Sequence, residues 1–261
     1  MLRQDRQRSI YKLWDDLADF GAGQVDRALF YLMNALAEEL GADDIIWVGA
    51  LRVVRGRLAH KDPLKGWRVR VFEHLTAPPE IEQRSAEAMR EQDQEVALTT
   101  RALALSAGRF RVYRLRDGFI DFAAFRKTLH YRKFYQEPGI RDRLWVAFPT
   151  MADAESVFVV DRYHSRQRFT ENDAAYAGAL LRGLKWFHRQ LFLSHGLHLV
   201  DTPIPPSQRR VLNALLSDMS EKQIAAQLGL SPGTTHQYAV EIYRRFGVNG
   251  RAGLMALWLG G

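Results

Sequence analysis

Cysteine is absent from this sequence of 261 residues. The chain therefore has no disulfide framework, no thiolate zinc site and no catalytic thiol. It also lacks any uninterrupted apolar run near the ~20 residues that span a bilayer. The first residues, Met1–Arg6, lack the apolar stretch of a secretion signal. We expect a cytoplasmic protein with no membrane partner.

Sequence motifs of enzyme chemistry are also missing. The eight histidines show no metal-ligand spacing such as HExxH, and the chain has no phosphate-binding loop and no GxSxG serine motif. We therefore predict that the protein is not an enzyme and that it uses no metal or cofactor. Internal repeats and low-complexity tracts are absent as well.

Positive charge is in excess, with 37 Lys and Arg against 30 Asp and Glu and a formal net charge of +7. Such an excess favours a polyanionic partner. Its placement does not single out a DNA-binding segment, because residues 201–261 carry six basic and four acidic residues. Residues 109–143 carry ten basic and four acidic residues. This basic segment could bind an anionic ligand or a nucleic-acid backbone, or it could simply form a solvated surface.

Three prolines in the segment Asp201–Pro206 mark the clearest break along the chain. Proline stops a helix and restricts the residue before it to extended conformations, so we expect a stiff link here. We predict a first domain in residues 1–199, a proline-rich linker in residues 200–206 and a second domain in residues 207–261.

Hydrophobic periodicity predicts both helices and strands in the first domain. The expected helices are Val25–Leu40, Glu80–Gln94, Phe122–Tyr135 and a long one over residues 170–195 that Thr170 caps. The expected strands are Ile45–Val54, Trp67–Phe72, Phe110–Leu115 and a hairpin of Leu144–Pro149 with Ser156–Asp161. This order resembles GAF or PAS-like sensory domains, in which helices cover an antiparallel sheet around a small ligand. An autoinducer-type fold is the remaining alternative.

Aromatic residues of this domain could line a ligand pocket or simply form its core. The candidate pocket residues are Trp47, Trp67, Phe72, Tyr131, Tyr135 and Trp145. The pattern of acyl-homoserine-lactone receptors is not matched, because Asp62-Pro63 is present but no tyrosine follows Trp47 by one helical turn. We do not expect that ligand, and the identity of a small-molecule ligand stays open.

Capping signals predict three short helices in the second domain. The first helix starts at Pro206-Ser207. The second starts at the capping box Ser220–Gln223 and stops at Gly229, and the third starts at Ser231-Pro232 and stops at Gly247. Two helices joined through Gly229 and Leu230 can approach closely because Ala225 and Ala226 are small. The polar surface of the third helix would fit the major groove of DNA.

Residues 205–259 resemble the LuxR/GerE family of helix-turn-helix domains. The matching segments are Val211-Leu212, Ser220–Gly229 (SEKQIAAQLG), Leu230–Thr234 (LSPGT), Ile242-Tyr243, Phe246–Val248 and Arg251-Ala252. Departures from the family pattern are Gln208, Asp218, Thr235 and Gly250. The predicted fold class is thus an α+β sensory domain, with an antiparallel sheet and flanking helices, followed by an all-α four-helix LuxR-type domain.

The resemblance implies a role for each matching position. The implied base contacts are His236, Gln237, Val240 and Glu241, and the implied phosphate contacts are Lys222, Thr234, Arg244 and Arg245. A fourth helix over Arg251–Leu259 is expected to expose Leu254, Leu257 and Trp258 for dimerisation. The implied partners are double-stranded DNA and a second copy of the chain, with RNA polymerase as a further candidate.

Together these expectations describe a sequence-specific, dimeric DNA-binding transcription regulator that a small molecule in the first domain controls. The alternative is a constitutive regulator whose first domain only dimerises or binds a protein partner.

Overall fold

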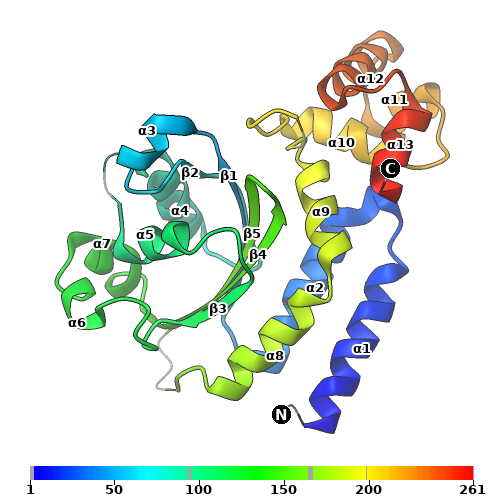
Figure 1. Cartoon of the computed structure of the whole chain (residues 1–261). Helices are drawn as coiled ribbons and strands as arrows, with labels where there is room; N and C mark the ends of the chain where they lie inside the picture. Colours follow the sequence, from blue (N-terminus) through cyan, green and yellow to red (C-terminus); the bar gives the residue numbers. More distant parts are fainter. Residues whose placement is uncertain (1–2, 93, 95, 164–166, 198, 261) are drawn as a thin grey trace. The chain divides into compact units, whose positions relative to one another are not determined.

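Contacts between residues divide the chain into two units (Figure 1). The computed structural model describes residues 3–92, 94, 96–163, 167–197 and 199–260. One unit combines Met1–Trp14 with Tyr31–Lys185, and the other combines Asp15–Phe30 with Trp186–Gly261. The second unit therefore contains more than the C-terminal helices. The domain boundary expected at residues 200–206 stays a prediction.

A five-stranded antiparallel sheet forms the centre of the first unit, in the order β2-β1-β5-β4-β3. Its strands are β1 (Asp44–Arg52), β2 (Trp67–His74), β3 (Arg111–Arg114), β4 (Ile140–Met151) and β5 (Ala154–Tyr163). The hairpin of β4 and β5 confirms the expected one, and the central strand β5 is buried along almost its whole length. The sheet and its helices confirm the predicted α+β class.

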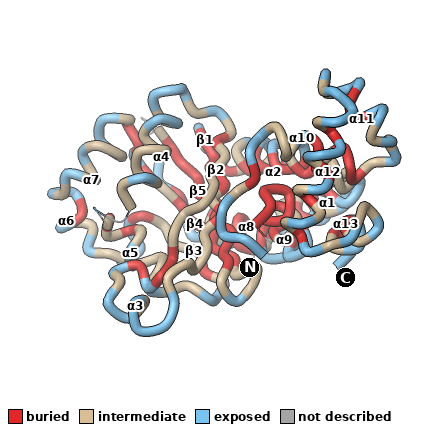
Figure 2. The backbone as a smooth tube through the Cα atoms, turned by 90° about the horizontal axis from the view of Figure 1, so that it is seen from above, coloured by how far each residue is buried: buried red, intermediate tan, exposed pale blue. Residues whose placement is uncertain are grey.

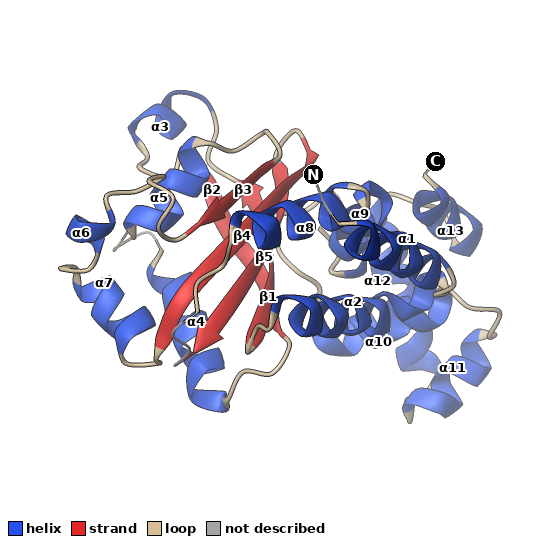
Figure 3. Ribbon diagram, turned by 90° about the horizontal axis from the view of Figure 1, so that it is seen from below, coloured by secondary structure: helices blue, strands red, loops and turns tan. Residues whose placement is uncertain are grey.

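Helices lie on both faces of this sheet (Figure 3). The helices of the first unit on one face are α4 (Pro79–Glu91), α5 (Leu98–Leu105), α6 (Phe122–Phe125), α7 (Leu129–Tyr131) and the π-helix η2 (Arg132–Gln136). On the opposite face lies α8 (Glu171–Arg182), beside the parts of α1 (Gln4–Ala18) and α2 (Val25–Leu40) that belong to this unit. The short α3 (Gly56–Lys61) connects β1 to β2.

The single helix expected over Phe122–Tyr135 is wrong, because the structure has three short helical pieces there. Thr128 is the reason for the interruption. Its backbone is extended and its hydroxyl oxygen accepts the amide hydrogen of Tyr131, so it starts a new helix. The Thr128 hydroxyl also donates to the Phe125 carbonyl at the end of the piece before it.

The long helix expected over residues 170–195 is wrong as well. The structure confirms its start at the Thr170 cap but breaks it into α8, which ends at Arg182, and α9 (Lys185–Ser194). Gly183 lies in the break.

A tryptophan from another helix causes this break. The Trp14 indole Nε1 donates a 2.9 Å hydrogen bond to the Leu180 carbonyl, which in an uninterrupted helix would accept the amide hydrogen of Leu184. The Leu184 amide instead donates to the Leu181 carbonyl. Gly183 permits the approach, since a Cβ at this position would lie 2.1 Å from the Trp14 ring.

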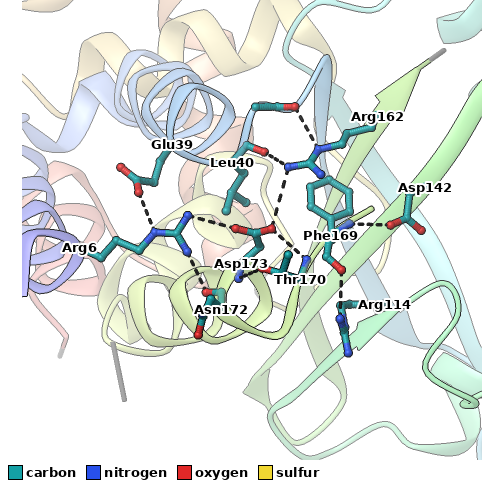
Figure 4. A network of polar contacts seen from close by, with 11 residues as sticks. Arg6, Glu39, Leu40, Arg114, Asp142, Arg162, Phe169, Thr170, Asn172 and Asp173 are labelled. Carbon is teal, nitrogen blue, oxygen red and sulfur yellow. Dashed lines mark hydrogen bonds and ion pairs between the residues drawn. The ribbon is translucent and has the colours of Figure 1, made fainter. Parts of the chain in front are cut away.

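Two arginines hold the start of α8 to other elements of the first unit (Figure 4). Arg6 of α1 pairs with Asp173 at 3.0 Å and with Glu39 of α2 at 2.9 Å. Arg162 of β5 donates to the Leu40 carbonyl at the end of α2 and lies 4.0 Å from the other oxygen of Asp173. Asp173 is therefore the shared partner through which α1, α8 and β5 meet.

The second unit is helical. Its elements are the last residues of α1, the 3-10 helix η1 (Ala22–Gln24), the start of α2, then α9, α10 (Pro206–Leu215), α11 (Glu221–Leu228), α12 (Pro232–Phe246) and α13 (Arg251–Leu259). The four C-terminal helices share one apolar core that includes Leu212, Ile224, Ala239 and Ile242, and their buried stretches are visible in Figure 2. Helices α10, α11 and α12 begin at their expected capping signals, and α11 and α12 end just before Gly229 and Gly247. Helix α13 has the bounds that the family resemblance implies. Among the described residues, no helix is long and apolar enough to cross a bilayer.

The packing at Gly183 predicts the effect of adding one methyl group. Gly183→Ala should lower the free energy of unfolding by about 1–3 kcal/mol, because the Cβ must displace the half-buried indole of Trp14. The measurement is urea denaturation followed by circular dichroism. Gly233→Ala is the matched control, since the nearest atom to its Cβ would be 3.9 Å away and alanine favours a helix. Equal stability of both variants would contradict the proposed cause of the break.

Candidate functional site

The turn between α11 and α12 depends on residues that local chemistry selects. Gly229 ends α11 with a φ of 65°, a left-handed conformation that other residues adopt at a cost. The Leu230 amide then donates to the Ala225 carbonyl. The Ser231 hydroxyl oxygen accepts the amide hydrogen of Thr234 at 3.0 Å and starts α12. These bonds set the angle at which α12 leaves the turn.

One face of α12 is open to solvent. His236, Gln237, Val240 and Arg244 are exposed, and the Val240 side chain is 49% exposed. Their spacing of three and four residues places them on one side of the helix. Thr235, where the family pattern has valine, is buried, and its hydroxyl donates to the Ser231 carbonyl, so the departure leaves no unsatisfied group.

Several of the predicted contact residues have partners inside the protein, among them Gln237, whose amide donates a 3.4 Å hydrogen bond to Glu241. The Gln208 amide donates a 2.6 Å hydrogen bond to Glu241, a pairing that the usual glutamate at Gln208 would not allow. His236 lies 3.0 Å from the Glu221 carboxylate. Arg245 is half-buried and donates to the Gly196 carbonyl at 3.2 Å. Arg245 thus differs from the exposed Lys222 and Arg244.

The fourth helix does not expose the residues expected on its surface. Leu254 is fully buried and Trp258 is 8% exposed, because both pack into the core of the C-terminal helices. The Trp258 ring lies 5.7 Å from that of Phe246, and Leu257 is half-buried against the same core. The expectation of exposure is therefore wrong for Leu254 and Trp258. The exposed residues of α13 are Ala252, Met255, Ala256 and Leu259.

A segment from the N-terminal part of the chain packs on α10 in the same unit. Asp26 forms an ion pair with Arg209 and accepts a 3.3 Å hydrogen bond from Asn213. At Gly23 a Cβ would lie 2.3 Å from the Asn213 carbonyl oxygen, so only glycine allows this approach. The sequence contained no signal for this contact, since it joins residues 183 positions apart.

A cavity of about 200 Å³ lies in the first unit between the sheet and helices α4 and α5. Its walls are mostly apolar and include Phe72, Met89 and Trp145. A second cavity of about 170 Å³ adjoins it, since both are lined by Val48 and Trp145 among other residues. Their combined size suits a small organic molecule.

Of the six aromatic residues expected at a pocket, four line one of the two cavities and two line neither. Phe72, Tyr135 and Trp145 line the larger cavity, and Trp67 lines the smaller one. Tyr131 stacks on Tyr135, with ring centroids 5.6 Å apart, and lines neither cavity. Trp47 also lines neither, because neighbouring residues of a strand point to opposite faces, and its indole donates to Ser156 instead.

Charged groups beside the larger cavity are neutralised within the protein. Arg143 forms two 2.5 Å hydrogen bonds with the buried carboxylate of Asp161 and donates a third bond to the Tyr135 hydroxyl. Burial raises the pKa of Tyr135, so its hydroxyl keeps its proton. Burial and the charges of Arg143 and Lys133 lower the pKa of His130 to about 4, so its ring is neutral at physiological pH. Arg84 and Glu91 also line the cavity and pair with Glu137 and Lys133. Each charged group of the lining therefore has an opposite charge as its partner.

A further polar group at this cavity was missed by the sequence analysis. Ser85 of α4 lines the cavity, and behind it stand His74 of β2 and Asp44 of β1. The three residues come from three elements with no motif spacing, so only the fold brings them together. Across the described parts of the chain, no group of three or more His, Cys, Asp or Glu side chains could hold a metal ion.

Comparisons with known proteins agree with the helical arrangement of the C-terminal segment. Residues 205–257 match the family described as "Bacterial regulatory proteins, luxR family". No curated protein matches the chain.

Three solved structures resemble the chain at low sequence identity. SdiA in complex with octanoyl-rac-glycerol has 11% identity and a TM-score of 0.48, over 98% of this chain and 93% of that one. Escherichia coli SdiA has 12% identity and a TM-score of 0.46, over 96% and 95%. The LBD domain of VqsR from Pseudomonas aeruginosa has 13% identity and a TM-score of 0.45, over 70% and 94%.

The cavity predicts uptake of an uncharged apolar dye such as N-phenyl-1-naphthylamine. Ala88→Trp, which places an indole in the cavity wall on α4, should weaken dye binding by roughly tenfold or more. Fluorescence titration measures this affinity. Gln83→Trp, on the exposed side of the same helix, should bind as the parent protein does. Equal affinities for all three proteins would place the dye outside this cavity.

Proposed function

We propose that this protein is a sequence-specific DNA-binding transcription regulator that acts as a dimer and responds to a small molecule. The observation that carries the proposal is the luxR-family helix-turn-helix domain at residues 205–257, with the solvent-exposed face of α12. Such a helix enters the major groove, where its N-terminal half meets base edges. RNA polymerase is then a candidate partner in transcription.

The exposed residues divide into two kinds of DNA contact. Gln237 has an amide that pairs with adenine, and Val240 offers a methyl contact to thymine. His236 and Glu241 complete the proposed base-reading set once they exchange their internal partners for bases. Lys222, Thr234 and Arg244 are the proposed phosphate contacts. Arg245 joins them only after its bond to the Gly196 carbonyl is released.

Dimerisation is proposed through an apolar stripe on α13. Ala252, Met255, Ala256 and Leu259 recur at intervals of three and four residues, and Leu259 is 89% exposed. These residues replace Leu254 and Trp258, which the core already uses. A two-fold pair would place two copies of α12 about one DNA turn apart on an inverted repeat.

Control by a small molecule is proposed because the cavity is mostly apolar and of ligand size, and the charged residues of its lining are paired within the protein. Helix α2 offers a route for the signal, since its first six residues belong to the second unit and the rest to the first. Asp26, in the first turn of α2, pairs with Arg209 of α10. A ligand needs to favour one arrangement by only about 1–3 kcal/mol to change DNA affinity 5- to 150-fold. The GAF- or PAS-like character of the first unit is part of this proposal.

Two substitutions on α12 should separate phosphate contacts from base contacts. Arg244→Ala should weaken binding to every DNA sequence alike and lower the slope of log affinity against log salt by about 1, because one phosphate contact is lost. Gln237→Ala should instead relax the preference at one base pair by roughly 1–3 kcal/mol. Fluorescence anisotropy with operator and scrambled DNA measures both effects. Arg90→Ala, an exposed arginine of α4, is the control and should change neither. DNA affinity that does not depend on salt would contradict the proposal.

Charge on the α13 stripe should prevent dimerisation. The double substitution Met255→Glu with Leu259→Glu places two carboxylates per copy at the proposed interface, where like charges repel. Light scattering should then give the mass of one chain, 30.0 kDa, where the parent protein gives twice that value. Leu105→Glu, at an exposed leucine of α5, is the matched control and should remain dimeric. A parent protein that is monomeric both free and with DNA would overturn this part of the proposal.

A further inference from the structure

Ser85, His74 and Asp44 form a continuous line of hydrogen bonds in the first unit. The Ser85 Oγ lies 2.9 Å from His74 Nε2, and His74 Nδ1 lies 2.6 Å from Asp44 Oδ2. The His74 ring and the Asp44 carboxyl group are almost completely buried, with side chains 1% and 0% exposed. Both distances are those of well-formed hydrogen bonds.

The partners of Asp44 indicate which atom donates and which accepts in each hydrogen bond of this line. Its Oδ1 accepts the backbone amides of Leu75 and Thr76 at 3.2 and 3.1 Å, and Tyr163 donates its hydroxyl to Oδ2. A carboxylate only accepts, so the hydrogen of the imidazole lies on Nδ1 of His74. A neutral imidazole in this tautomer has its lone pair on Nε2, which lies within hydrogen-bond distance of the Ser85 hydroxyl.

The cavity lies on the other side of Ser85. Ser85 lines the cavity of about 200 Å³, whereas neither His74 nor Asp44 does. The serine oxygen therefore stands between the space that a small molecule would occupy and a base that a carboxylate holds in place. A hydroxyl with such a base is the arrangement by which a serine becomes a nucleophile.

We infer that Ser85 is an activated nucleophile that accepts the acyl group of a small, uncharged, mostly apolar ester bound in this cavity. The Ser85 Oγ bonds to the carbonyl carbon while His74 Nε2 takes the hydroxyl proton. The ester C–O bond then breaks, the leaving alcohol takes that proton from His74, and an acyl-serine remains. Water with His74 as base returns the serine and releases the acid. Asp44 is the positioning residue, because it acts only through His74.

The ester class follows from the chemistry of the walls. Three charged side chains line the cavity, and each has an opposite charge as partner: Arg143 pairs with Asp161, Arg84 with Glu137 and Glu91 with Lys133. A charged molecule would have to displace one of these partners, which favours an uncharged one. The apolar residues around it suit a short acyl chain. The inference uses the cavity of the proposed function but does not depend on DNA binding.

The test uses the full-length protein and a fluorophosphonate that carries a short alkyl chain. Intact mass and peptide mapping should show one adduct at Ser85, absent in Ser85→Ala. His74→Gln should slow labelling at least ~100-fold, the usual effect of losing a general base. Asp44→Asn should slow it as well, because an amide can donate to Nδ1 and move the imidazole hydrogen to Nε2. His60→Gln, at an exposed histidine of α3 that lines neither cavity, is the matched control and should label within twofold of the parent.

A second measurement covers the case in which a buried substitution disturbs folding. Because the chain contains no cysteine, Ser85→Cys introduces the only thiol of the protein. Its alkylation by iodoacetamide should be faster than that of Ser106→Cys, where the native hydroxyl donates to the Ala102 carbonyl. Adding His74→Gln should remove the difference.

The substrate arm uses p-nitrophenyl butyrate. Either a trapped butyryl adduct on Ser85 or turnover that Ser85→Ala abolishes supports the inference. A parent protein that neither labels nor hydrolyses above Ser85→Ala, with a Ser85→Cys thiol no more reactive than the Ser106→Cys thiol, overturns it. DNA binding by the same variants separates this outcome from failure of the proposed function, since Ser85→Ala should bind DNA as the parent does.

Discussion

The carboxylate of Asp161 lies fully buried in the central strand of the sheet, and much of the first unit is arranged around the cost of that burial. Removing one partner of a buried ion pair costs about 3–5 kcal/mol, so Arg143 on the neighbouring strand must stay in place. Arg143 in turn holds the Tyr135 hydroxyl and forms one wall of the cavity. Because the pair neutralises itself, the cavity is polar in places but carries no net charge. That property restricts what the cavity can bind.

The same requirement for partners explains the polar line at Ser85. Asp44 lies one strand away from Asp161 and is equally buried, but its carboxylate is satisfied by backbone amides, Tyr163 and His74. His74 then needs a partner for its second nitrogen, and Ser85 on the covering helix supplies one. The hydrogen bonds that pair the buried Asp44 and His74 thus also place a serine beside a base at the edge of the cavity. The two roles differ only in whether a molecule with a reactive carbonyl reaches Ser85.

In the second unit the internal bonds of the helix-turn-helix set what remains available for DNA. Arg251 donates three hydrogen bonds to carbonyls at the end of α10 and in the turn that follows it, so its charge stabilises the fold. Arg245 is committed to Gly196, and Glu241 to Gln208. Gln237, Val240, Arg244 and Lys222 face solvent. The proposed recognition set therefore combines exposed side chains with His236, Glu241 and Arg245, which must give up a partner inside the protein to contact DNA.

The sequence by itself determined the features that arise from near neighbours. The start of a helix is capped by a nearby side chain, as at Ser220 and Ser231, and its end is marked by a glycine such as Gly229. The C-terminal helices and the family they resemble could therefore be recognised without a structure. Alternating apolar and basic residues likewise marked β2 and β3. Contacts between distant residues were decided only by the tertiary structure. Trp14 breaks a helix that its own residues favour, Leu254 and Trp258 turn inward because a core is there to receive them, and Ser85 meets His74 across two elements. No local pattern encodes such contacts, since their energy comes from burial and hydrogen bonding that exist only once the chain has folded.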